Sequence, residues 1–193
     1  MGMLASLYTL SDDNIEKVID NPLLLEIVTD QQDPDAYERA RQREMPGLLQ
    51  RLLGRKAPVR SDPANFVLAD GEALDVDLDK AWHGLHYMLT RTAWDGNPPL
   101  NFIVQGGRDI DEYSRAFSAA DVTAIDAALG LINTALLASR FDADEMDRLD
   151  IYPGIWANPE NEALDYCLEH FILLKDFIHQ AAHRLLGMVV CIG

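Results

Sequence analysis

The chain has 193 residues, enough for one well-packed core, and its 48% hydrophobic content is that of an ordinary folded domain. Its 32 acidic side chains against 16 basic ones give a formal net charge of −16. This charge disfavours binding to nucleic acids and to anionic membranes, because both would repel the protein. It fits a basic protein partner, a cation or simply high solubility.

The sequence carries no sign of secretion or membrane insertion. Cys167 and Cys191 are too few for a secreted disulfide framework and do not form a C-x-x-C pair. The opening "MGMLASLYTL" lacks the basic residues of a signal peptide. No stretch approaches the roughly 18 apolar residues that span a bilayer. We therefore expect a cytoplasmic protein that does not bind membranes.

The first third of the chain predicts one strand followed by short helices. Residues 4–10 are apolar and partly alternating, as in a strand. Ser11 before two acids is a good helix start, and Pro22 opens a second short helix. A third helix follows Asp33, and "LLQRLLG" adds one or two helical turns.

The middle of the chain predicts strands around a helix. Residues 65–77 indicate a short strand, a turn at Asp70–Gly71 and an approach to a helix that begins near Asp79. The run "LNFIVQGG", residues 100–107, is the clearest strand in the sequence, stopped by its two glycines.

The last part predicts mainly helices. Ser118 and Asp121 are spaced as a capping box for a helix over residues 118–137, and a further turn or two follows at residues 141–149. After the aromatic loop "IYPGIWANP", one long helix covers residues 160–186, Gly187 closes it, and "MVVCI" forms a terminal strand. Together these elements predict an α+β (mixed α/β) fold, a single domain over residues 1–193 with a small mixed sheet packed with helices.

The segment "DKAWHGLHYML", residues 79–89, is the densest group of chemically active side chains. Helical spacing places Trp82 and Leu85 on a buried face, gathers Asp79, His83 and His86 on one other side, and puts Tyr87 further round. Three interpretations stay open: a packed helix with hydrogen-bonded histidines, a pocket wall, and a metal or catalytic centre. Two histidines do not make a metal site, so we expect no metal.

Other signals for a site are weaker. His179 and His183 have the spacing of a metal-binding pair, but they lie on the narrow polar side of the long helix. A solvent-exposed face is the simpler interpretation. Tyr152 and Trp156 fit either a stacked ligand or corner packing. No nucleotide-binding glycine motif, phosphate-binding loop or nucleophile elbow is present, so no cofactor is predicted.

The sequence resembles the YfbM-like family, bacterial proteins that carry a domain of unknown function. The resemblance is carried by "LDVDLDKAWHGLHYMLT", "LNFIVQGG", "SRAFSAADV", "FDADEM" and "IYPGIW", which are spread along the chain. It implies a compact mixed α/β domain without an established activity or cofactor. The family-typical positions are Asp79, Lys80, Trp82, His83, His86, Arg115, Tyr152, Pro153 and Trp156.

Two functional hypotheses follow. The first is a non-enzymatic protein-binding module, comparable to an immunity or inhibitor protein, whose charge favours a basic partner. The second is a small-molecule enzyme in which His83 and His86 carry out general acid–base hydrolysis or group transfer, with Arg115 as an anion anchor. A structural domain that serves oligomerisation is a third possibility. The candidate pocket residues are Asp79, Trp82, His83, His86, Tyr87, Arg115, Tyr152 and Trp156.

Overall fold

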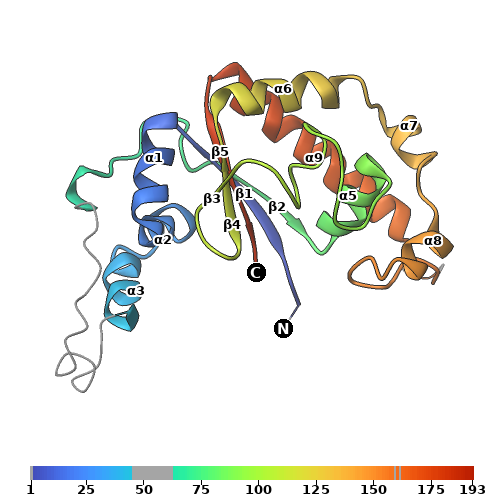
Figure 1. The fold of residues 1–193 in the computed structure, drawn as a ribbon, viewed down its shortest axis with the longest axis horizontal. Helices are drawn as coiled ribbons and strands as arrows, with labels where there is room; N and C mark the ends of the chain where they lie inside the picture. The colour runs from blue at the N-terminus through green and yellow to red at the C-terminus, as the bar shows by residue number, and fades with distance from the viewer. Residues whose placement is uncertain (1, 45–62, 159, 161) are drawn as a thin grey trace.

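The computed structural model describes residues 2–44, 63–158, 160 and 162–193. Its centre is a five-stranded sheet in the order β2-β1-β5-β4-β3, with helices against both faces (Figure 1). Every described strand pairing is antiparallel, so the sheet is not mixed, whereas the predicted α+β class is confirmed. The strands are β1 (Ala5–Leu10), β2 (Asp75–Asp79), β3 (Arg108–Asp109), β4 (Ser114–Phe117) and β5 (Gly187–Ile192).

Helices form two groups, one on each side of the sheet (Figure 1). The first group packs in one apolar cluster and contains α1 (Asp12–Asp20), η1 (Pro22–Leu24), α2 (Leu25–Thr29) and α3 (Ala36–Glu44). A short 3-10 turn, η2 (Pro63–Asn65), precedes the loop that leads to β2. The second group packs in the larger cluster and contains α5 (Ala81–Thr90), α6 (Ala119–Gly130), α7 (Thr134–Ala138), α8 (Ala143–Arg148) and α9 (Ala163–His183). No helix in the described ranges has the length and apolar character needed to cross a bilayer.

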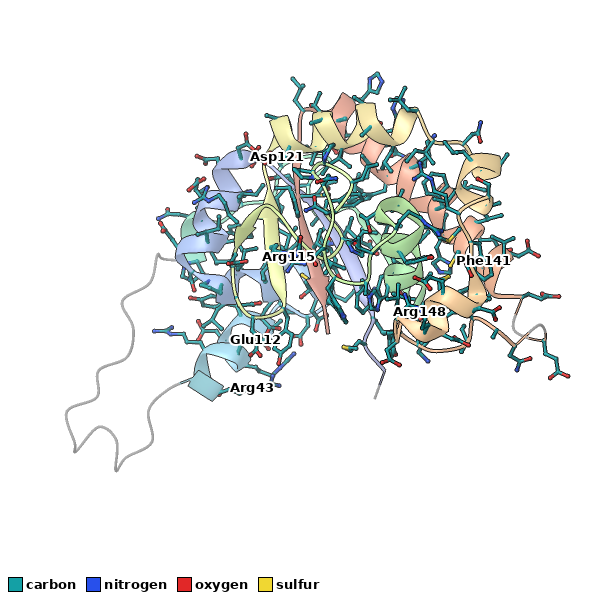
Figure 2. The ribbon with its side chains drawn as sticks, turned by 45° about the vertical axis from the view of Figure 1, so that its right-hand side comes forward. Arg43, Glu112, Arg115, Asp121, Phe141 and Arg148 are labelled. Carbon is teal, nitrogen blue, oxygen red and sulfur yellow. The ribbon has the colours of Figure 1, made fainter. Side chains whose placement is uncertain are left out.

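The two terminal strands occupy the middle of the sheet. β5 pairs with β1 on one side and with β4 on the other, and Leu7 lies opposite Val190. Side chains alternate between the faces, so Val190 packs in the larger cluster and Val189 in the smaller one. Arg115 on β4 shares the face of Phe117, which is the face that α5 and α9 cover (Figure 2).

The strand predicted at residues 100–107 is wrong. Residues 98–104 form consecutive turns, in which the amides of Val104 and Gln105 donate to the carbonyl of Asn101. Phe102 and Ile103 are buried, which explains the apolar run. A short apolar run reports burial and does not distinguish a strand from a buried turn.

Other predicted boundaries also move. The strand near residues 65–77 follows the turn instead of preceding it, as β2. The helix predicted over residues 118–137 is interrupted, and Asn133 caps α7 separately. The turns predicted for "LLQRLLG" lie outside the described residues.

The end of α9 differs from the prediction because Leu185, and not a glycine, adopts the left-handed conformation, with φ of 56°. The amides of Leu185 and Leu186 donate to the carbonyls of Ala182 and Ala181, the two bonds of a Schellman motif. Gly187 instead begins β5, where an added Cβ would lie 2.4 Å from the carbonyl oxygen of Phe117. The close approach of β4 therefore explains this glycine.

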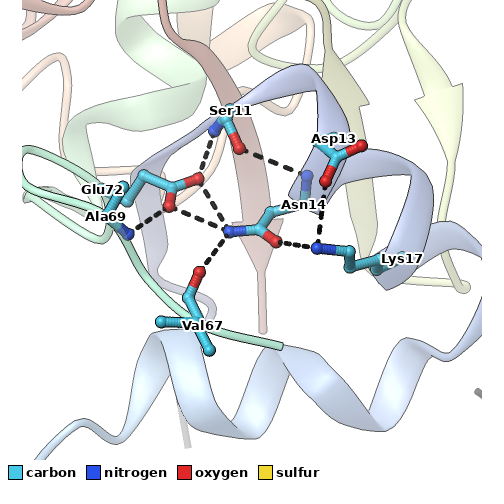
Figure 3. A network of polar contacts seen from close by, with 7 residues as sticks. All are labelled: Ser11, Asp13, Asn14, Lys17, Val67, Ala69 and Glu72. Carbon is cyan, nitrogen blue, oxygen red and sulfur yellow. Dashed lines mark hydrogen bonds and ion pairs between the residues drawn. The ribbon is translucent and has the colours of Figure 1, made fainter. Parts of the chain in front are cut away.

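Glu72 ties the loop before β2 to the start of α1 (Figure 3). The residue is 8% exposed, and its carboxylate accepts hydrogen bonds from the Ser11 amide at 2.6 Å, the Asn14 side chain at 2.9 Å and the Ala69 amide. Burial would raise the pKa of Glu72, but these hydrogen bonds outweigh it, and the pKa is lowered.

We predict that Glu72→Gln destabilises the fold by about 1–3 kcal/mol at neutral pH, because a neutral amide oxygen accepts these hydrogen bonds more weakly and its NH2 group faces donors. A carboxylate with a lowered folded pKa stabilises the protein above its unfolded pKa of about 4.5, and this stability is lost as the pH falls through the folded pKa. Urea unfolding at pH 7 and pH 4 measures both effects, with the exposed Glu169→Gln as the control. Equal stability of the two variants at pH 7 would contradict the role given to Glu72.

Candidate functional site

The helix α5 is buried on every side. All residues from Ala81 to Leu89 are buried, so the predicted division into an apolar face and a polar face is wrong. A Cβ on Gly84 would lie 2.4 Å from the Trp156 ring and 3.0 Å from the sulfur of Cys167 in α9. This close packing places the two histidines inside the protein.

His83 joins two loops through its ring. Its Nε2 lies 2.7 Å from the Ala93 carbonyl oxygen, and its Nδ1 lies 2.9 Å from the Tyr152 amide nitrogen. A carbonyl can only accept and an amide N–H can only donate, so Nε2 carries the proton and Nδ1 accepts. Burial lowers the pKa of His83, although the hydrogen bond to Ala93 acts in the opposite direction. His83 is therefore neutral, and both of its nitrogens are engaged.

His86 holds the same loop one helical turn further on. Its Nε2 donates to the Asp95 carbonyl oxygen at 2.9 Å, and the ring is completely buried. Nδ1 has no partner within the described part of the chain. Burial is the main cause that lowers the pKa of His86 to about 4; the hydrogen bond to Asp95 acts in the opposite direction, and the charge of Arg115 lowers the pKa further.

Asp79, Tyr87 and Trp156, which were also predicted as pocket residues, do not lie together in one pocket. Asp79 ends β2 and accepts a hydrogen bond from the Tyr166 hydroxyl at 2.8 Å. Tyr87 is buried, with the Arg91 guanidinium 4.8 Å from its ring centre. Trp156 is buried against Gly84 and donates to the Ile151 carbonyl at 2.6 Å.

Tyr152 belongs to the surroundings of Trp82. Its ring is half-buried and stacks with Trp82 at a centroid distance of 6.0 Å. The second histidine pair of the sequence, His179 and His183, lies on the exposed surface of α9, as the simpler interpretation predicted. Nδ1 of His179 lies 3.3 Å from the Asp126 carboxylate. No group of three or more potential metal ligands occurs among the residues that the structure describes.

A pocket lies beside α5, between the loop that the histidines hold and the ends of the central strands. We call it the aromatic pocket. Its volume is about 550 Å³, and Trp94 and Tyr113 in its wall are 52% and 62% exposed. It is lined by Met3, Trp82, Trp94, Val104, Glu112, Tyr113, Arg115, Ile192 and Gly193.

The two histidines support one wall of the aromatic pocket without lining it. Trp82 stacks on His83 at 4.8 Å with an angle of 10° between the rings, and Trp94 lies 4.2 Å from the same imidazole. The Trp82 Nε1 donates to the Met3 carbonyl at 3.3 Å. Because the histidines of α5 bind the carbonyls of Ala93 and Asp95, the residue between these two, Trp94, is held in place. Neither histidine lines the pocket itself.

Arg115 places a cation in the wall of the aromatic pocket. Its side chain is half-buried, and one Nη donates to the Ile103 carbonyl at 3.2 Å. Burial lowers the pKa of Arg115 and the charge of Asp109 raises it, but no carboxylate of the described chain lies within 4 Å as an ion-pair partner. Of the predicted site residues, Trp82 and Arg115 are thus the two that line one pocket.

Trp94, Tyr113 and Met3 were not predicted as site residues. Each stands alone in its sequence neighbourhood, two of them in loops, so no periodicity or spacing marks them. Their shared feature is exposure around one pocket, which only the fold reveals.

We predict that the wild-type protein loses about 1.5 kcal/mol of stability between pH 6.5 and pH 5 through His86. The unfolded chain binds a proton at His86 near pH 6.5, whereas the folded chain binds it only near pH 4, so stability falls across this window. The His86→Gln variant can still donate to Asp95 but cannot titrate, and its stability should fall less. Urea unfolding at both pH values tests this, and the exposed His179→Gln provides the control. An acid loss in His86→Gln as large as in the wild type would contradict the prediction.

Comparisons with known proteins identify the family and the fold. The sequence model of a protein family, the domain of unknown function DUF1877, matches residues 1–191. The crystal structure of YfbM, a protein of unknown function from Escherichia coli, matches with a TM-score of 0.64 and 14% identity, over 98% of this chain and 99% of that chain. A search of curated proteins finds no match. The structural likeness supports the fold alone, while the family model covers nearly the whole sequence; the chain therefore belongs to the DUF1877 family of YfbM-like proteins.

Proposed function

We propose that the protein is a non-enzymatic protein-binding module and that the aromatic pocket is the centre of its binding surface. The observation that carries this proposal is the convergence of exposed Trp94 and Tyr113 with Arg115 on one pocket. Tryptophan, tyrosine and arginine are the residue types that dominate the energetic centres of protein interfaces. Exposed apolar surface of this kind is costly in water and is typical of binding sites.

One part of the pocket wall, the Trp82 ring, is held in place before any partner arrives. Trp82 is buried, stacks on His83 and donates a hydrogen bond to Met3, so its ring has little freedom to lose. A preorganised surface binds more tightly because less side-chain entropy is lost on association. The volume of about 550 Å³ is also in the range of sites that hold a bound group.

The charge of the protein supports a basic partner, as expected for an immunity-like or inhibitor-like protein. The net charge is −16, and the exposed residues Asp95, Asp111 and Glu112 lie in the loops that border the pocket. An acidic surface accelerates association with a basic protein and makes the rate depend on salt. A cytoplasmic location is part of this proposal.

Catalysis by the two histidines receives less support from the geometry. His83 has no free nitrogen, and the unpartnered Nδ1 of His86 is buried. A general acid or base must come within hydrogen-bond reach of its substrate and needs a pKa near the working pH. The ionisable side chains that do line the pocket are Arg115, Glu112 and Tyr113, and none of them is a histidine.

We predict that peptides selected from a random display library against the full chain bind through the aromatic pocket and are rich in Lys and Arg. Trp94→Ala and Tyr113→Ala should each weaken their binding at least tenfold, because they remove exposed contact area at the centre. Leu131→Ala, which changes an 83% exposed apolar residue just after α6, should leave binding unchanged. Titration calorimetry at low and high salt measures the effect. Selected peptides that bind the Trp94 variant and the wild type equally would overturn the proposal.

A further inference from the structure

We propose that the aromatic pocket receives a carboxylate that is attached to an aromatic or similarly large apolar group, and that Arg115 binds this carboxylate. The inference rests on the proposed function of the pocket and adds the chemistry of the group that enters it. It is carried by a guanidinium that has no ion-pair partner among the described residues and by the apolar walls around it.

Arg115 lacks the ion pair that several exposed arginines of the described chain form. Arg108, Arg148 and Arg39 are largely exposed, and each forms an ion pair, with Glu16, Glu145 and Asp33 respectively. Arg115 is half-buried and has no such pair, and its only described hydrogen bond goes to a backbone carbonyl. Arg140 is also half-buried and its guanidinium donates to the carbonyls of Met88 and Leu89, but it does not line the pocket. The chain has twice as many acidic as basic residues, so a carboxylate is lacking at Arg115 because of its position and not because acids are scarce.

The unsatisfied state of this guanidinium is costly. The Nε of Arg115 is buried and has no partner among the residues described, and burial lowers the pKa of the side chain. A partly desolvated cation gains most from an anion that accepts two parallel N–H bonds, which is the geometry of a carboxylate. The pocket is therefore lined by a guanidinium whose hydrogen-bonding capacity the described residues satisfy only in part.

The rest of the wall determines what carries the carboxylate. Two indoles and one phenol, from Trp82, Trp94 and Tyr113, surround the space, and Met3, Val104 and Ile192 complete it with apolar atoms. Aromatic faces bind a flat ring by stacking, and a volume of about 550 Å³ accommodates one. A small polar acid would leave these walls in contact with water.

Glu112 makes it possible to test whether the pocket binds an anion or a cation. It lines the same pocket from the turn between β3 and β4, opposite in charge to Arg115 (Figure 2). If the pocket binds an anion, Glu112 weakens binding and Arg115 strengthens it. If the pocket were an aromatic cage for a cation, the two residues would have the reverse effects.

The acidic surface does not contradict a carboxylate ligand. Charges in water are screened beyond roughly 8 Å at physiological salt, so the charges that line the pocket, Arg115 and Glu112, act most strongly on a group inside it, while the net charge of −16 acts on the body of the partner. A basic polypeptide that ends in an aromatic residue with a free C-terminal carboxylate satisfies both conditions. A free aromatic acid is the second source of the same chemistry.

Titration calorimetry with the full chain tests the inference. The probes are N-acetylphenylalanine and its amide, together with the peptide acetyl-Lys-Lys-Lys-Phe as the free acid and as the C-terminal amide. For the wild type we expect each acid to bind at least tenfold more tightly than its amide. Arg115→Gln should abolish this difference, Glu112→Gln should tighten the acids severalfold, and the exposed Arg148→Gln should change nothing.

Two further variants keep the result interpretable. Arg115→Lys retains the charge without the planar fork and should lose part of the preference for the acid, and thermal unfolding of each variant shows whether it is folded. Trp94→Ala should weaken the acids and the amides alike. The peptide acid binding tenfold more tightly than N-acetylphenylalanine, with a loss at high salt, assigns the carboxylate to a polypeptide end, whereas equal affinities assign it to a free aromatic acid.

The overturning results are distinct from those that test the proposed function. Equal binding of acid and amide, with no effect of Arg115→Gln, would overturn the carboxylate inference, while continued dependence on Trp94 would leave the pocket as the binding site. Binding of benzyltrimethylammonium that tightens in Arg115→Gln and weakens in Glu112→Gln would replace it with a cation site. Absence of binding by both acids to the folded wild type would also overturn it, whatever the display selection yields.

Discussion

The structure depends on a neutral imidazole that two loops share. His83 donates to Ala93 and accepts from Tyr152, so it holds the segment after α5 and the segment after α8 against one buried helix. An imidazolium could not accept from the Tyr152 amide, and an apolar side chain would leave both backbone groups unsatisfied. This requirement explains why a histidine occupies a completely buried position, and it fixes the tautomer of the ring.

The candidate site is a consequence of the same interaction. Because His83 and His86 hold the carbonyls of Ala93 and Asp95, the side chain between them, Trp94, is held beside Trp82. The central strand β5 and the turn before β4 close the other sides, and Arg115 rises from the sheet between them. Each wall comes from a different part of the chain, so the pocket exists only when the two terminal strands, the loop after α5 and the β3–β4 turn are assembled together.

Local features were predictable from sequence and long-range ones were not. Ser11 and Ser118 cap their helices as predicted, and both terminal strands form, because a cap or a β-branched run is specified within a few residues. The run at residues 100–107 failed as a strand because burial of Phe102 and Ile103 was achieved in turns. The histidines were correctly found as unusual, yet their role depends on Ala93 and Tyr152, whose positions no spacing encodes. Nothing in the sequence marked Trp94 and Tyr113 as site residues. Their exposed rings suggest a binding site only because the fold places them around the same pocket as Arg115, which has no ion-pair partner among the described residues.

The central claim, that the two histidines of α5 are neutral structural anchors behind the pocket and not its chemical groups, is tested most directly by the ring nitrogens themselves. Long-range ¹H–¹⁵N NMR spectra of the uniformly labelled protein, recorded from pH 7.5 to pH 5, report the protonation and tautomer of each imidazole. We predict that His86 shows the neutral form with the proton on Nε2 throughout this range, and that His83 has the same tautomer and becomes protonated only below its ordinary pKa of 6.5, because burial lowers the pKa of both rings. Conversion of either ring to imidazolium near pH 6.5, or a proton on Nδ1 of His83, would contradict the claim.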